Sequence, residues 1–217
     1  VLGLQVKLLQ LMVVDLNFHR VKKKFLLIIF LLFSTNSYSQ NYNFKKITKL
    51  DEPWGSSFIS NDEIIVTEKY GKIKIVNINS KNTYEIKHNL NFLSVGQGGL
   101  LDILYKDNFI WVSYSEDRGN SKTSTSIAKA KLDKAELNFK NIFQANPPIE
   151  SGYHFGSRLA IKGNYLFASA GERGQGMIAQ DPTKHPGSII RIYTNGRIPE
   201  DNPKFEGKSD WLPEIYQ

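Results

Sequence analysis

From about Phe44 onward, the apolar residues come in short segments rich in β-branched and aromatic side chains, and turn residues separate these segments. Residues 64–68, the turn Tyr70-Gly71-Lys72 and the alternating segment 73–78 predict a β-hairpin, to which residues 83–87 add a third strand. In this part of the chain no apolar stripe with the period of a helix persists over about ten residues. The pattern therefore predicts an all-β fold.

The same arrangement of strand, turn and strand recurs twice further along the chain. Turns at 106–108 and 162–164 each separate two apolar segments, and each pair is followed by an outer strand. In the first of these units strands are expected at 99–105, 109–115 and 124–132, with a polar loop at 116–122, and in the second at 154–161, 165–171 and 187–193.

Units of short strands that repeat every 40–60 residues or so are typical of propeller blades. A two-sheet sandwich has similar strands, so the spacing alone leaves both folds open. The innermost strand of each unit begins near glycine, at Gly55, Gly98-Gly99 and Gly156. Because crowding near a propeller axis leaves little room for side chains, these glycines favour the propeller.

Composition narrows the possible chemistry. The 217 residues contain no cysteine, so neither a disulfide nor a thiolate site is available, and 41% hydrophobic residues suffice for a packed core. The formal charge is +7, of which residues 1–39 contribute +4 and the remainder +3. No face of Lys and Arg with interleaved aromatic residues appears in residues 40–217, so we expect no nucleic-acid partner.

Residues 21–39 have the organisation of a secretory signal peptide. Lys22-Lys23-Lys24 precede an apolar run at 25–33, and Ser37-Tyr38-Ser39 forms a small-x-small cleavage site before residue 40. As a helix this run spans roughly 14 Å, about half of a bilayer core, so we expect no stable membrane insertion. The expected product is a periplasmic or secreted protein, and residues 1–20 are interpreted as an upstream extension of the reading frame.

The strongest candidate for chemistry is His154, which stands between two glycines in Ser151-Gly152-Tyr153-His154-Phe155-Gly156. It lies where the third unit begins its inner strand. A neutral imidazole is the side chain best suited to take a proton from an alcohol near neutral pH. A lone histidine is also often a structural group, so the residues alone leave both roles open.

Three segments, in this order, resemble the soluble quinoprotein sugar dehydrogenases of the glucose/sorbosone dehydrogenase family. They are Gly96-Gln97-Gly98-Gly99-Leu100-Leu101-Asp102, residues 151–159 and Pro186-Gly187-Ser188-Ile189-Ile190-Arg191-Ile192. The resemblance extends from about residue 50 to residue 217. It implies a six-bladed β-propeller, of which residues 40–217 form about the N-terminal half.

The same resemblance implies an enzyme that oxidises the C1 hydroxyl of aldose sugars to lactones, with pyrroloquinoline quinone (PQQ) as hydride acceptor and calcium as a second cofactor. It makes His154 the general base beside the quinone, and it places Gln97 in contact with substrate and cofactor. Glu172 stands where the family usually has Asp, and Arg173 follows at a position that reaches the substrate, so Arg173 is expected to be a pocket cation or a surface charge. Arg158 and Arg191 are expected to fix loops.

The family's Gly-x-Arg-Asn segment, which holds the quinone, and its calcium-binding loop do not occur in these residues. We therefore expect a truncated chain that is inactive alone, with the calcium ligands beyond it and no metal site within it. Two other functions stay open, a calcium-dependent propeller lactonase and a non-catalytic propeller that binds carbohydrate or protein. The preferred sugar, the electron acceptor and the oligomeric state are not assigned.

Overall fold

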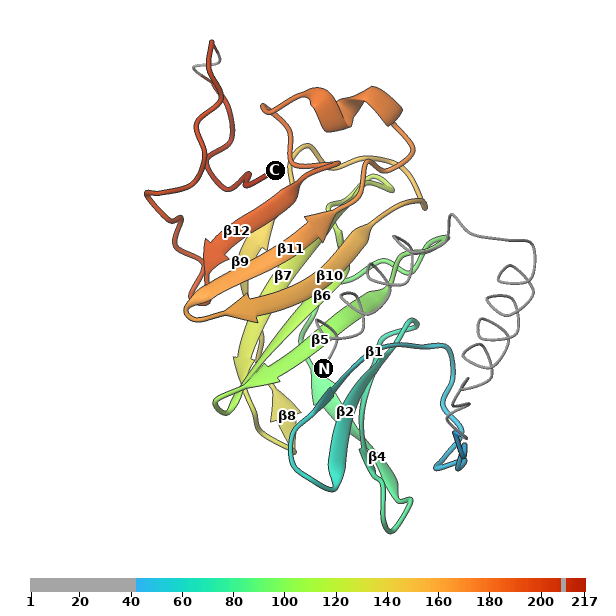
Figure 1. The fold of residues 1–217 in the computed structure, drawn as a ribbon. Helices are drawn as coiled ribbons and strands as arrows, with labels where there is room; N and C mark the ends of the chain where they lie inside the picture. Colours follow the sequence, from blue (N-terminus) through green and yellow to red (C-terminus); the bar gives the residue numbers. More distant parts are fainter. Residues whose placement is uncertain (1–41, 208–209) are drawn as a thin grey trace, which may run out of the picture. The chain divides into compact units, whose positions relative to one another are not determined.

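A computed structural model describes residues 42–207 and 210–217. The expected signal peptide at 21–39 and the expected extension at 1–20 lie outside the described residues. The described residues form three β-sheets and one short 3₁₀ helix, η1 (Gly176–Gln180) (Figure 1). None of their helices is long and apolar enough to cross a membrane.

Each sheet begins with an inner strand and continues outward mainly along the sequence. Sheet 1 has the order β1 (Pro53–Phe58), β2 (Glu63–Glu68), β3 (Lys72–Asn77), β4 (Thr83–His88) and β8 (Glu136–Leu137). Sheet 2 has the order β5 (Leu100–Lys106), β6 (Phe109–Asp117), β7 (Thr123–Lys131) and β9 (Lys140–Gln144), and sheet 3 the order β10 (Gly156–Lys162), β11 (Tyr165–Ala170) and β12 (Ile189–Tyr193). All pairs are antiparallel except the parallel pair of β4 and β8.

The expected strands are confirmed, with small shifts at their ends. In the β2–β3 hairpin Ile64 faces Val76 and Glu68 faces Lys72, as the alternating pattern requires. Two expectations were wrong in detail. Strand β6 continues to residue 117 into the expected polar loop, and β10 begins at Gly156, two residues later than the expected start at residue 154. Strands β8 and β9 and helix η1 were not expected.

The hydrophobic core lies in two layers, one on each side of sheet 2. On one side Ile65, Ile73 and Ile75 pack against side chains of β5 and β6, and on the other Trp111 and Ile127 pack against sheet 3. Because sheet 2 is covered on both faces, β6 is buried along almost its whole length instead of alternating.

The inner strands lie side by side, since β5 contacts both β1 and β10. Their backbones approach closely where glycine occurs. A Cβ atom added at Gly55 would lie 2.7 Å from the Cα atom of Asp102 in β5. The expected crowding is confirmed at this position. The loops that precede β5 and β10 also approach closely, since a Cβ atom added at Gly96 would lie 2.4 Å from the Gly152 carbonyl oxygen.

Candidate active site

Three loops at one end of the inner strands bring the candidate residues together. Residue 97 lies in the loop before β5, residue 154 in the loop before β10, and residue 172 directly after β11. The Gln97 N–H donates to the Gly152 carbonyl at 2.7 Å, and the His154 N–H donates to Gln97 Oε1 at 2.8 Å. The structure thus places the two sequence-predicted residues in direct contact, although they belong to different sheets.

The imidazole of His154 pairs with a carboxylate that sequence reasoning did not assign to the site. His154 Nδ1 hydrogen-bonds Glu172 Oε1. The bond from His154 lowers the pKa of Glu172 below its usual value, so this carboxylate is ionised at neutral pH and can only accept. In the neutral imidazole the proton therefore lies on Nδ1, and Nε2 keeps its lone pair.

His154 Nε2 is accessible. The side chain of His154 is 54% exposed, and its Nε2 atom has no hydrogen-bond partner among the residues that the structure describes. An imidazole that is oriented through one nitrogen and open at the other is the arrangement of a general base. The geometry is compatible with proton abstraction from a ligand hydroxyl.

Polar side chains of sheet 2 support the irregular start of β10. The pairing of β10 with β11 shifts register between Gly156 and residue 159, so part of the β10 backbone lacks its partner in β11. Thr125 Oγ1 donates to the Phe155 carbonyl at 2.7 Å, and Ser113 Oγ donates to the Ser157 carbonyl at 2.7 Å. Sheet 2 therefore fixes the segment that follows His154.

Arg173 lies in the interior, against the loop that carries His154. Its side chain is 1% exposed, so the interpretation as a surface charge is wrong. Four hydrogen bonds occupy its guanidinium: Nε donates to the Tyr153 carbonyl at 3.0 Å, Nη1 to the Thr123 carbonyl at 3.0 Å, and Nη2 to Thr123 Oγ1 at 2.7 Å and to the Ser151 carbonyl. Because an arginine side chain has five N–H groups, a direct role in substrate binding has at most one donor left.

Arg191 fixes a loop, as expected, whereas Arg158 links two strands. Arg158 Nη1 donates to Asp102 Oδ1 at 2.9 Å, which links β10 to β5. Arg191 Nε donates to Asn202 Oδ1 at 2.5 Å, and Arg191 Nη2 donates to Asp201 Oδ1 at 2.6 Å. These bonds hold the loop that follows β12 against that strand.

Glu172 is the residue of this site that sequence reasoning missed as a functional group. Its place after Gly171 was noted, but only as a departure from the usual Asp. The available signal was the combination of a carboxylate and glycine at a strand end, which places an acidic group at the same edge as the histidine loop. Among the described residues no cluster of three or more His, Cys, Asp or Glu side chains can hold a metal ion.

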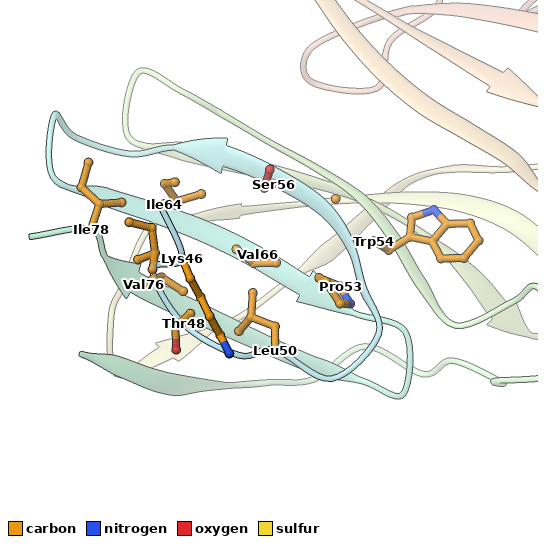
Figure 2. A pocket seen from close by; sticks show the side chains of 12 residues that line it. Lys46, Thr48, Leu50, Pro53, Trp54, Ser56, Ile64, Val66, Val76 and Ile78 are labelled. Atoms are coloured by element: carbon orange, nitrogen blue, oxygen red, sulfur yellow. The ribbon is translucent and has the colours of Figure 1, made fainter. Parts of the chain in front are cut away.

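Two cavities lie away from these loops. One, of about 330 Å³, separates residues 46–50 from the outer face of sheet 1, and Figure 2 shows Ile64, Val66 and Val76 lining it. Another, of about 340 Å³, is lined by residues that include His185 and Glu214. Neither of these two cavities is lined by His154.

Comparison with known proteins identifies relatives of this architecture. The profile of the Glucose / Sorbosone dehydrogenase family matches residues 50–217. The aldose sugar dehydrogenase YliI of Escherichia coli K12 is 33% identical over 178 residues, which cover 77% of this chain and 48% of the relative. The chain therefore spans about half the length of the curated relatives it matches.

Solved structures agree in fold. The soluble aldose sugar dehydrogenase of Escherichia coli, in its apo form, has a TM-score of 0.71 and 31% identity, covering 76% of this chain and 50% of that one. The PQQ-bound aldose sugar dehydrogenase of Streptomyces coelicolor has a TM-score of 0.65 and 23% identity, covering 77% and 50%. The three sheets correspond to about the N-terminal half of a six-bladed β-propeller, and the chain belongs to the glucose/sorbosone dehydrogenase family.

Proposed function

We propose that the whole protein is an exported quinoprotein that oxidises the C1 hydroxyl of aldose sugars to the lactone. The observation that carries the proposal is the His154–Glu172 pair, which leaves His154 Nε2 without a hydrogen-bond partner among the described residues, in a loop whose backbone Gln97 binds. Sugar oxidation is the activity named for the relatives of this chain.

His154 acts as the general base in this proposal. Its Nε2 takes the proton of the C1 hydroxyl while the C1 hydride leaves with its electron pair, and the imidazolium that forms is stabilised by the ionised Glu172. The pair thus supplies both the orientation of the ring and a counter-charge for the product of proton transfer. When bound, PQQ supplies the two-electron acceptor for the hydride.

Gln97 is proposed to bind both the sugar and the cofactor. Its Oε1 already accepts the His154 N–H, so the amide plane is fixed, and its Nε2 has no partner among the described residues. The two N–H groups of that atom fit the hydroxyl oxygens of a sugar and the carbonyl and carboxylate oxygens of a quinone such as PQQ. Calcium remains part of the proposal, with no ligand assigned to this chain.

The sequence supports a periplasmic or secreted location, because residues 21–39 have the pattern of a cleaved signal peptide. The partner is a small sugar; the electron acceptor stays unassigned. We keep the expectation that residues 1–217 alone are inactive, since they span about half the length of the relatives.

The test uses protein expressed from its complete gene and supplied with PQQ and calcium. We expect it to reduce an artificial electron acceptor when aldoses are added, and the sugar product to be the lactone. A matched preparation without PQQ controls for background reduction. Absence of turnover with every aldose tried, in protein shown to contain PQQ, would contradict the proposed function.

A further inference from the structure

Arg173 is a fully buried cation that forms no ion pair with a carboxylate among the residues that the structure describes. Its guanidinium donates hydrogen bonds to the Tyr153, Thr123 and Ser151 carbonyls. It also lies over the face of the Phe155 ring, with Cζ 3.7 Å from the ring centroid. Burial lowers the pKa of Arg173 to about 10, so the side chain stays protonated at neutral pH. A buried charge is costly unless its surroundings are arranged to receive it.

Apart from Thr123, which begins β7, the groups that receive this charge surround His154 in the sequence. Ser151 and Tyr153 precede it and Phe155 follows it, so the guanidinium binds the histidine loop on both sides. The main chain adds a further contact, because the Arg173 N–H donates to the His154 carbonyl at 3.3 Å.

The loop needs such support because its backbone conformation is unfavourable. His154 has a φ of 48°, in the left-handed region that a residue with a side chain rarely adopts. Conformations of this kind persist where the surrounding contacts over-determine them. Here the Arg173 side chain supplies the hydrogen bonds to the Tyr153 and Ser151 carbonyls, while Gln97 and Thr125 bind the His154 N–H and the Phe155 carbonyl.

We propose that Arg173 is a positioning residue that holds the loop 151–155 so that His154 faces Glu172. This inference rests on the proposed role of His154 as the base, and it replaces the expected contact between Arg173 and the sugar. Arg173 does not contact the imidazole. It holds the backbone on either side of His154, and Glu172 then orients the ring through its hydrogen bond to Nδ1.

The first measurement is independent of quinone and sugar. Protein expressed from its complete gene is treated with diethyl pyrocarbonate over a range of pH, and the modification rate of His154 is followed by mass spectrometry of its peptide. We compare wild type with Arg173→Met, which keeps the length of the side chain and removes its donors, and with Glu172→Gln. Arg191→Met is the matched control, because Arg191 is also buried and also ties down a loop, but not the loop of His154.

If Arg173 positions His154, the modification rate of His154 will depend on pH in Arg173→Met as it does in Glu172→Gln. The variant that combines both substitutions will show no additional change in this pH dependence. Arg191→Met will lower thermal stability and keep the wild-type profile. A wild-type profile in Arg173→Met would overturn the proposal and leave Arg173 a merely structural residue. A wild-type profile in Glu172→Gln would overturn it as well, because no pairing would then exist to maintain.

Two further arms keep the test decisive. If Arg173→Met does not fold, Thr123→Val replaces it. This change removes the Oγ1 acceptor of Arg173 Nη2, together with the longer hydrogen bonds of 3.4 and 3.5 Å that Oγ1 donates to the Ile149 and Ser151 carbonyls. A profile shifted toward that of Glu172→Gln supports the proposal and an unchanged profile overturns it. In PQQ-loaded protein, Arg173→Met should lower kcat by about 10²-fold with a smaller change in KM, the effect expected of a base displaced by about 1 Å. A protein that oxidises no aldose, but whose His154 profile depends on Arg173, would refute the dehydrogenase and retain the positioning role.

Discussion

Gly171 offers a direct way to displace the candidate base without altering any functional group. It lies between β11 and Glu172, and its φ is outside the left-handed region, so alanine can adopt its backbone conformation. A Cβ atom at this position would lie 1.9 Å from the His154 carbonyl oxygen, whereas real Cβ contacts below 3.0 Å are essentially never observed. Gly171→Ala must therefore move the two segments apart by at least about 1.1 Å.

A displacement of this size is large for a catalytic group. Misplacement by about 1 Å costs on the order of 10² in rate, so we expect kcat to fall by about 10²-fold. The hydrogen bond of 2.9 Å from the Gly171 N–H to the Phe155 carbonyl should lengthen too, with a moderate loss of thermal stability.

The assay compares kcat and melting temperature of PQQ-loaded wild type, Gly171→Ala and the control Gly163→Ala. Gly163 lies in the turn at the far end of β10, where an added Cβ meets open space but φ is +60°. The control should therefore lose about 1–2 kcal/mol of stability and keep its kcat. Wild-type kcat in Gly171→Ala would refute the reasoning, because either the loop tolerates the displacement or His154 is not the base.

Three further outcomes are expected. His154→Ala should lower kcat by about 10²–10⁴-fold and leave the melting temperature nearly unchanged, as kinetics and thermal unfolding will show, whereas a structural histidine would give the reverse. Burial raises the pKa of Glu68, but its bonds to Lys74 and to the main chain outweigh burial and lower it overall, so Glu68 stabilises the fold above its ordinary pKa of 4.5 and loses this effect as pH falls through the lowered value. Glu68→Gln should thus lower the unfolding temperature at pH 7, and its difference from wild type should shrink as pH falls below 4.5; a loss that stays constant with pH would contradict this assignment. N-terminal sequencing of exported protein should begin near Gln40, and a start upstream of residue 33 would exclude the proposed cleavage.

The strands could be predicted from the sequence because each sheet obeys a local rule. The alternation of apolar and polar residues from 73 to 78 and the turn before it predict the β2–β3 hairpin. The glycines near the start of the inner strands predict close packing of their backbones, which the structure shows at Gly55. Strand β8 could not be predicted because it has only two residues. It pairs in parallel with β4, almost fifty residues earlier, and the local sequence pattern carries no information about such a distant pairing.

The site could be predicted only in part, for the same reason. His154 and Gln97 were found because each lies in a glycine-rich segment of recognisable type. The pairing with Glu172 depends on how the loop after β11 returns to the loop before β10, and this is a property of the folded sheet. The surface-charge alternative for Arg173 was open because a charged residue in a polar loop is usually exposed, and nothing in the sequence indicates that carbonyl groups surround this one.

The hydrogen bond from the His154 N–H to Gln97 Oε1 joins loops that belong to separate layers of the molecule. Its length therefore measures the alignment of sheet 2 with sheet 3. A slide of one sheet along the other by less than an ångström would break this bond while every strand kept its partners. On heating, the site should consequently fail before the sheets do, and activity would be lost at temperatures where the circular dichroism of the strands is still that of the native protein.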